Sequence, residues 1–186
     1  MQRNSLEEVS YTIAPVEDFS IFTGFLCSPP NAKDSDLEDF LATDAHRHLK
    51  DRIAVTYALI STGAPCIPLG FATLANDALV IDRENPLPEV AGYPYTSFPA
   101  VKIGRFGIAL PLQRHGLGGL FLAMLKKLMG EGNRTGCRFI TVDAWRNRRA
   151  GVDVTPFYKK HGFAILPCRN KASNDAPMYF DLKTYA

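Results

Sequence analysis

One strand, loop and helix in the second half of the chain constrain the fold most strongly. A strand is predicted over 101–110, followed by a loop with three glycines and a helix over 117–129. The helix is predicted by apolar residues that recur every three or four positions, at Leu117, Leu120, Phe121, Met124, Leu125, Leu128 and Met129. A stripe this wide packs firmly on a sheet, so the helix fixes the loop that precedes it.

Within the strand, the apolar residues change phase. Val101 and Ile103 are at odd positions, whereas Phe106, Ile108 and Leu110 are at even positions. Because successive side chains point to opposite faces, one buried face cannot hold all five in a regular strand. An extra residue near Gly104-Arg105, a β-bulge, restores the phase, and a strand buried on both faces is the alternative. We expect the bulge to bend the strand from its neighbour and to free backbone groups for a ligand.

The glycine-rich loop runs directly into the helix and consists of Gln113, Arg114, His115, Gly116, Leu117, Gly118 and Gly119. Its glycines allow the backbone to approach a ligand closely. The first amides of a helix have no internal partner and carry partial positive charge, so they suit a pyrophosphate. Two nucleotide motifs fit poorly, because no Lys-Ser or Lys-Thr follows the glycines and Phe121 occupies the third small position of a dinucleotide fingerprint.

The rest of the chain predicts a mixed α/β sheet within one domain spanning 1–186. Strands are predicted over 11–16, 53–60, 69–74, 79–81, 138–145, 163–166 and 178–182, and helices over 36–50 and 155–162. Ser35 and Glu38 form a capping-box pattern at the start of the first helix. The segment 61–68 predicts a hairpin connection, and 82–99 predicts a long ordered loop of functional importance.

Composition narrows the class of protein further. Hydrophobic residues make up 46% of the chain, yet no apolar run reaches the roughly 18 residues of a membrane span. The polar N-terminus lacks the features of a signal peptide, so we expect a cytoplasmic protein with no membrane association. Four widely spaced cysteines predict buried thiols and no metal site: Cys27, Cys66, Cys137 and Cys168.

The charge is divided unevenly along the chain. Residues 1–100 carry 6 Lys and Arg against 14 Asp and Glu, which gives −8, and residues 101–186 carry 15 against 5, which gives +10. A basic half can concentrate an anionic ligand. Two solvated faces of opposite sign within one fold are the alternative.

Two segments resemble the signatures of the GNAT N-acetyltransferases. Phe106-Gly107-Ile108-Ala109 followed by Gln113-Arg114-His115-Gly116-Leu117-Gly118 is similar to their motif A, an apolar strand, then Q/R-x-x-G-x-G/A, then a helix. Pro156-Phe157-Tyr158-Lys159-Lys160-His161-Gly162-Phe163 is similar to a second signature, an aromatic pair, polar residues and Gly-Phe. The resemblance covers 101–166. It implies an α+β fold whose mixed, mostly antiparallel sheet is flanked by helices and has a splayed, bulged central strand.

The resemblance also implies a co-substrate, acetyl-CoA, and a set of site residues. The pantetheine arm would pair with Phe106, Gly107 and Ile108, and the pyrophosphate would lie on the amides of the Gln113–Gly119 loop. Asn147 would lie near the cofactor. Arg146, Arg148 and Arg149 could bind a phosphate of coenzyme A or of an acceptor RNA, with a solvated basic loop as the alternative. Tyr158 would stabilise or protonate the leaving thiolate, although full transfer from a phenol to a thiolate is uphill by about 2 kcal/mol.

The alternative role for Tyr158 is an aromatic core residue. The bulged strand offers no carboxylate as general base, which leaves Glu84 and Glu89 in the long loop, or a water chain, as candidates.

The implied activity is transfer of an acetyl group to a primary amine of a small molecule, a protein or an aminoacyl-tRNA. Four segments more loosely resemble the GNAT toxins that acetylate aminoacyl-tRNA, at 36–41, 57–60, 70–74 and 104–106, and the basic second half suits tRNA. A non-catalytic acyl-CoA-binding module is the alternative of a different class. The sequence also leaves open a homodimer and an antitoxin partner.

Overall fold

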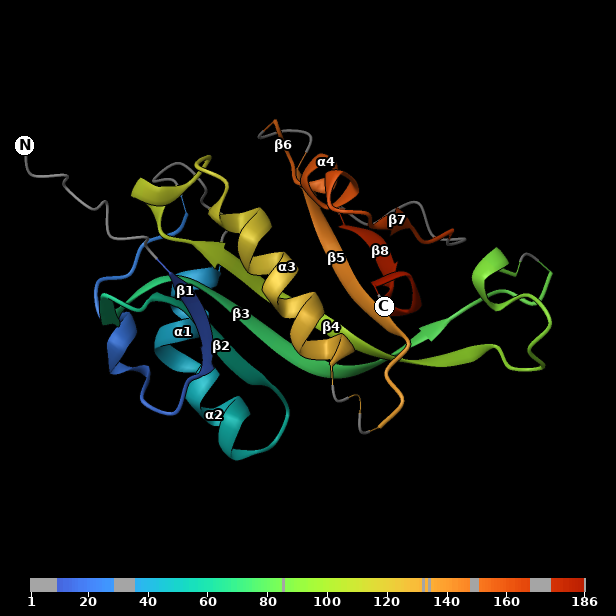
Figure 1. Ribbon diagram of the computed structural model, residues 1–186, viewed down its shortest axis with the longest axis horizontal. Coiled ribbons are helices and arrows are strands. Elements are labelled where there is room, and N and C mark those ends of the chain that lie inside the picture. Colours follow the sequence, from blue (N-terminus) through green and yellow to red (C-terminus); the bar gives the residue numbers. More distant parts are fainter. Residues whose placement is uncertain are drawn as a thin grey trace, which may run out of the picture.

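The computed structural model describes residues 10–28, 36–84, 86–131, 133, 135–147, 151–167 and 175–185. They form one sheet with the order β1-β2-β3-β4-β5-β8-β7, and β6 pairs with β5 beside this path (Figure 1). Among these residues β4 and β5 pair in parallel, and all other neighbouring strands pair antiparallel. The expected mixed, mostly antiparallel sheet with flanking helices is confirmed.

The strands are β1 (Tyr11–Pro15), β2 (Val55–Ser61), β3 (Ala64–Val80), β4 (Ser97–Ile108), β5 (Phe139–Asn147), β6 (Val152–Asp153), β7 (Ala164–Ile165) and β8 (Asp175–Asp181). The helices are α1 (Leu37–Thr43), α2 (Ala45–Lys50), α3 (Leu117–Gly130) and α4 (Thr155–Lys160), with short 3-10 turns η1 (Phe19–Phe22), η2 (Pro88–Val90), η3 (Leu110–Leu112) and η4 (Leu182–Tyr185). No helix in the described residues is long and apolar enough to cross a membrane.

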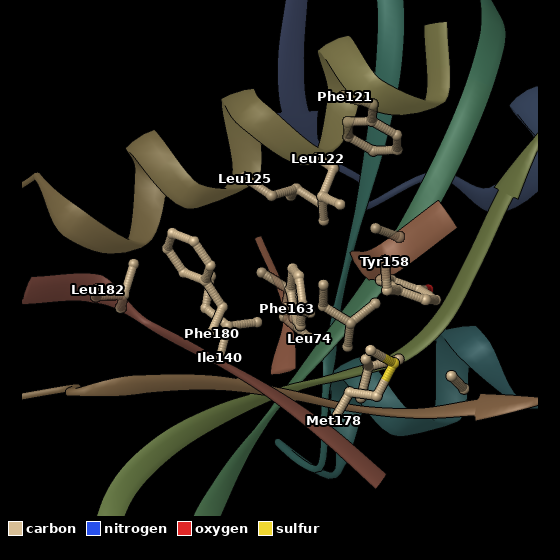
Figure 2. Close-up of a cluster of buried hydrophobic side chains, with 14 of the residues drawn as sticks. Leu74, Phe121, Leu122, Leu125, Ile140, Tyr158, Phe163, Met178, Phe180 and Leu182 are labelled. Carbon is tan, nitrogen blue, oxygen red and sulfur yellow. The ribbon is translucent and has the colours of Figure 1, made fainter. Parts of the chain in front are cut away.

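The sheet has a helical layer on each face. Consecutive residues of β2 and of β3 belong to different clusters. Leu59 and Ala72 pack with α3 and α4, whereas their neighbours Ala58 and Phe71 pack with α1 and η1. Because side chains alternate along a strand, these two clusters lie on opposite faces of the sheet. Figure 1 shows α3 along the middle strands and α4 beside the end of β5, and Figure 2 shows the larger cluster beneath α3.

Strand β3 is longer than the sequence predicts. The segment 69–74 and residues 79–80 belong to one strand of 17 residues, and the connection expected over 61–68 is only a turn at Thr62-Gly63. Pro68 pairs with Ile60 between two register shifts, which are irregularities that accommodate a proline in a ladder. Pairing with β4 continues to Val80, opposite Ser97. Hydrogen bonds to β2 and β4 therefore continue β3 through 64–68 and 75–78, where the sequence predicted a connection and a gap between two strands.

The helix expected over 36–50 is divided into α1 and α2 at Asp44. Ser35, the predicted N-cap, lies outside the described residues, and the residue before α1 is Asp36. The capping box itself therefore lies outside what the structure describes, but the Glu38 side chain has other partners. Its carboxylate accepts hydrogen bonds from the Cys27 amide at 2.8 Å, the Ser28 amide at 2.7 Å and the Ser28 hydroxyl at 2.8 Å. The side chain thus ties α1 to the segment that precedes it.

We expect Glu38→Gln to lower the stability at pH 7 by about 2 kcal/mol, because three hydrogen bonds to a charged acceptor are weakened or lost. Burial acts to raise the pKa of Glu38, but these hydrogen bonds outweigh it and lower the pKa from 4.5 to about 2. A depressed carboxyl pKa adds stability above pH 4.5, and that stability is lost as the pH falls toward 2. Urea unfolding at several pH values should show a smaller loss in this window for Glu38→Gln. Asp39→Asn, which changes the exposed carboxylate next to it, should keep the wild-type profile.

Helix α3 packs on the sheet through most of the predicted apolar stripe, at Leu117, Phe121, Met124, Leu125 and Met129, but the buried face is shifted at two positions. Leu120 and Leu128 are 38% and 36% exposed, whereas Phe121, Leu122, Leu125 and Lys126 are buried. The Lys126 ammonium donates to the carbonyl of His161 and lies 3.6 Å from the centre of the Phe180 ring. A lysine can occupy this apolar face because its charge is met by a carbonyl at the end of α4 and by an aromatic ring.

The cysteine prediction is partly correct. Cys27 is buried and Cys137 is half-buried, but Cys66 is exposed on β3, and all three are free thiols. Cys168 lies outside the described residues.

Candidate functional site

A β-bulge interrupts β4 where the sequence predicts it. Thr73 of β3 pairs with Arg105, but the next residue, Leu74, pairs with Ile103, so Gly104 has no partner on β3. The extra residue restores the phase of the strand: Ile103 and Ile108 both enter the cluster beneath α3. The odd and even apolar positions from Val101 to Ile108 therefore share one face, as expected from the phase change, whereas Leu110 lies beyond the strand in η3.

Strands β4 and β5 separate immediately after the bulge. They pair only from Ala100 opposite Phe139 to Ile103 opposite Val142. Beyond this point β4 stays paired with β3 and β5 stays paired with β8. The edge of β4 that faces β5 over 104–108 therefore has no strand partner within the described part of the chain. A cleft of about 1320 Å³ fills the separation.

The cleft brings together most of the residues expected to bind a cofactor. It is lined by Phe106, Gly107, Ile108, Gln113, Arg114, Gly116, Gly118 and Gly119, and Tyr158 also lines it. Two other predicted residues, His115 and Leu117, belong to the same loop but do not line the cleft. Asn147 is the last residue of β5, and its side chain lies outside what the structure describes.

The loop before α3 leaves the first amides of the helix open toward this cleft. Gly116 has a φ of 89°, which glycine adopts without strain, and it precedes the first helical residue. The first bond within the helix joins the amide of Leu120 to the carbonyl of Gly116 at 3.1 Å. No side chain in the described part of the molecule caps this end, so the amides of 117–119 are available to an anion.

The Gln113 side chain anchors the loop. Its amide nitrogen donates to the carbonyl of Cys27 at 2.6 Å and to the carbonyl of Ile108 at 3.0 Å. These bonds tie the loop to the end of β4 and to the segment before α1. The Gln113 side-chain nitrogen is therefore engaged within the protein, while the residue still lines the cleft. His115 is exposed, with Nδ1 2.7 Å from the Gln113 carbonyl.

Gly107 is a glycine because the opposite face of β4 is filled. A Cβ at this position would lie 2.9 Å from the sulfur of Cys27 and 2.9 Å from a ring carbon of Phe71. We expect Gly107→Ala to lower the free energy of unfolding by about 1–3 kcal/mol, which urea unfolding can measure. Gly104→Ala is the matched control on the same strand, because its nearest neighbour is 3.8 Å away. Equal stabilities of the two variants would contradict this account.

Tyr158 is positioned by aromatic packing. Its ring centre lies 5.1 Å from that of Phe157 and 5.3 Å from that of Phe163, and the residue is 6% exposed. Figure 2 shows Tyr158 and Phe163 in the cluster beneath α3. Burial raises the pKa of Tyr158 above its ordinary value of 10, so the phenol stays neutral and can donate a hydrogen bond. No described residue bonds to its hydroxyl. The side chain therefore combines a fixed ring with a hydroxyl available to a ligand in the cleft.

The two glutamates considered as general bases lie elsewhere. The Glu89 carboxylate accepts a hydrogen bond from the Tyr179 hydroxyl at 3.1 Å, and neither Glu84 nor Glu89 lines the cleft. Their segment packs through Leu87 and Val90 at the Ser97 end of β4, opposite the start of α3 (Figure 1). The expectation that they reach the site is wrong. The carboxylates that do line the cleft are Asp36, Asp143 and Asp175.

A strand that splits from its parallel neighbour beside an uncapped helix is typical of the GNAT acetyltransferase fold. Among solved structures, AtaT complexed with acetyl-methionyl-tRNAfMet is similar to this chain with a TM-score of 0.72 and 24% identity, over 95% of this chain and 97% of AtaT. A Tyr-to-Phe mutant of KacT gives 0.70 and 25% identity over 94% and 96%. AtaTR bound with AcCoA gives 0.66 and 24% identity over 94% of both chains. The protein thus has the fold of the AtaT and KacT toxins.

No protein-family model matches the sequence, and no curated protein matches it.

Proposed function

We propose that the protein is an acetyl-CoA-dependent N-acetyltransferase that transfers the acetyl group to a primary amine. The observation that carries this proposal is the convergence of three features on one cleft: the unpaired edge of β4, the uncapped start of α3, and Tyr158. Each feature suits a different part of the co-substrate. The structural likeness to AtaTR bound with AcCoA supports the same reading.

The chemistry of each feature fits coenzyme A. The amides of 117–119 and the positive end of the α3 dipole suit its diphosphate. The peptide-like pantetheine arm can pair with the free edge of β4 as an additional strand would. The amine lone pair then forms a C–N bond with the thioester carbonyl carbon, and the C–S bonding pair leaves with the sulfur. The proton released by the nitrogen ends on that sulfur, and Tyr158 stabilises the developing thiolate by hydrogen bonding.

A thiol-release assay tests this function directly. Purified protein is incubated with acetyl-CoA and one of several amines, and free coenzyme A is measured against a reaction without amine. The proposal predicts amine-dependent thiol release and an acetylated amine detected by mass spectrometry. Protein that binds acetyl-CoA but releases no thiol with any of the amines would favour the non-catalytic acyl-CoA-binding module.

For the acceptor, we propose the amino group of an aminoacyl-tRNA as the second, more specific candidate. AtaT has been solved with acetyl-methionyl-tRNAfMet, and this chain matches that structure over 95% of its length. The net charge of +10 over 101–186 also suits a polyanionic acceptor. Acetyl-CoA and charged tRNA meet in the cytoplasm, so this reaction would take place there.

Charged tRNA separates this candidate from other amines. Purified aminoacyl-tRNAs should become N-acetylated, and expression should arrest growth unless Tyr158 is replaced by phenylalanine. Harmless expression together with unmodified aminoacyl-tRNA would exclude the toxin-type function and leave a small amine or a protein amino group as the acceptor.

A further inference from the structure

The cleft is lined from both faces of the sheet. Ile103 and Val142 belong to the cluster beneath α3, so their neighbours Lys102 and Asp143 point to the opposite face. All four residues line the cleft, as does Trp145, which shares a face with Asp143. The separation of the strands thus has one side toward α3 and Tyr158, and another side toward Lys102, Asp143 and Trp145.

Asp143 lies at the point where the strands separate. It directly follows Val142, the last residue of β5 that pairs with β4. Lys102 Nζ is 2.5 Å from Asp143 Oδ2, and the two side chains are 37% and 46% exposed. The ion pair is therefore open to solvent at the apex of the cleft, beside the bulge at Gly104.

We propose that Asp143 binds the ammonium group of the acceptor, with Lys102 as the counter-ion that the acceptor displaces. This inference rests on the proposed acetyl transfer. If the diphosphate lies at the start of α3, the acceptor must reach the thioester from another direction, and the opposite face offers one. Of the other carboxylates that line the cleft, Asp36 binds Arg105 at 2.6 Å, and Asp175 lies opposite Trp145, farther from the apex.

The physical properties of the pair suit an exchangeable site. A solvent-exposed ion pair is weak in water, so a substrate ammonium can take the place of Lys102 at little cost. The indole of Trp145, two residues along the same face, adds attraction for a cation. The bound ammonium loses one proton to solvent before it attacks. The remaining steps are the C–N bond formation, C–S cleavage and proton transfer to sulfur given above.

Two variants of the ion pair should change the kinetics in opposite directions. Asp143→Asn removes the carboxylate, and we expect the KM for the amine to rise about tenfold or more, with the KM for acetyl-CoA changed by less than about twofold. Lys102→Met removes the competing cation, and the KM for the amine should fall. A purely structural ion pair predicts the same effect for both variants, since either change breaks it.

Asp77→Asn is the matched control. Asp77 accepts a hydrogen bond from Thr141 on the same face, two residues before Asp143, and it does not line the cleft. Its kinetic constants should stay within about twofold of wild type. Methionyl-tRNA, a lysine-containing peptide and spermidine serve as the amine probes, and melting temperatures without ligand report any loss of folding.

Each outcome has a distinct meaning. If the wild-type protein acetylates the amine and Asp143→Asn has the same KM for it, the ammonium site is overturned and the acetyltransferase function still holds. Folded wild-type protein that does not bind acetyl-CoA overturns the proposed function itself. Wild-type protein that binds acetyl-CoA but acetylates none of the three probes overturns both the catalytic proposal and the ammonium site.

Discussion

Replacing Tyr158 by phenylalanine is expected to lower kcat for acetyl transfer by about 100-fold or more. The ring that packs between Phe157 and Phe163 is retained, so the cleft keeps its shape. What is lost is the hydroxyl, whose raised pKa keeps it protonated and able to donate to a developing thiolate. Because that charge appears only in the transition state, kcat should fall while the affinity for acetyl-CoA stays nearly constant.

Steady-state kinetics with a thiol-release readout measure this effect, and acetyl-CoA binding is measured in parallel. Tyr179→Phe is the matched control: it removes a buried hydroxyl that bonds to Glu89, away from the cleft. It should cost about 1 kcal/mol of stability and leave kcat unchanged. A kcat for Tyr158→Phe within about threefold of wild type would show that Tyr158 is an aromatic core residue with no catalytic role.

Gly118→Asp is expected to weaken acetyl-CoA binding by about 100-fold. Gly118 is the second residue of α3 and lines the cleft, so an aspartate places negative charge among amides that would otherwise hold a diphosphate. Two like charges about 5 Å apart at an effective dielectric constant near 20 repel by about 3 kcal/mol, which corresponds to this loss. The new Cβ would be 3.4 Å from Phe157, a contact that a small movement of the ring relieves.

The same substitution should not destabilise the protein. Acidic residues in the first turn stabilise a helix through its dipole, and replacing a helical glycine adds to this. Loss of affinity without loss of stability would therefore identify an electrostatic effect on the ligand. Gly118→Asn, which has the same shape without the charge, should bind acetyl-CoA within about fivefold of wild type. Equal affinity of the Asp and Asn variants would contradict a diphosphate at this helix start.

The local parts of the site could be predicted from the sequence. The change of phase between Ile103 and Phe106 located the bulge at Gly104, because the side-chain alternation of a strand is a local rule. The glycine-rich loop marked the start of α3 at Leu117 for a similar reason. Both features depend on residues that are close in sequence, and both lie in the cleft.

The parts that depend on distant contacts could not be predicted. Glu84 and Glu89 belong to a segment whose position is set by packing against Phe139 and Tyr179, which no local pattern shows. Lys126 is buried because the carbonyl of His161 and the ring of Phe180 meet its charge.

Asp143 is a further example. It is the one charged residue in the stretch 139–145, and that was the available signal. Its place at the apex of the cleft follows only from the register of β4 with β5.

The central claim is that the cleft between β4 and β5 binds acetyl-CoA, and thermal unfolding with and without this ligand tests it most directly. A ligand that binds only the folded protein at 100 times its Kd adds about 2.7 kcal/mol, which raises the melting temperature of a chain this size by about 5–10 °C. We predict this shift for the wild-type protein and a much smaller one for Gly118→Asp. A cooperatively unfolding wild-type protein whose melting temperature does not change at millimolar acetyl-CoA would contradict the account.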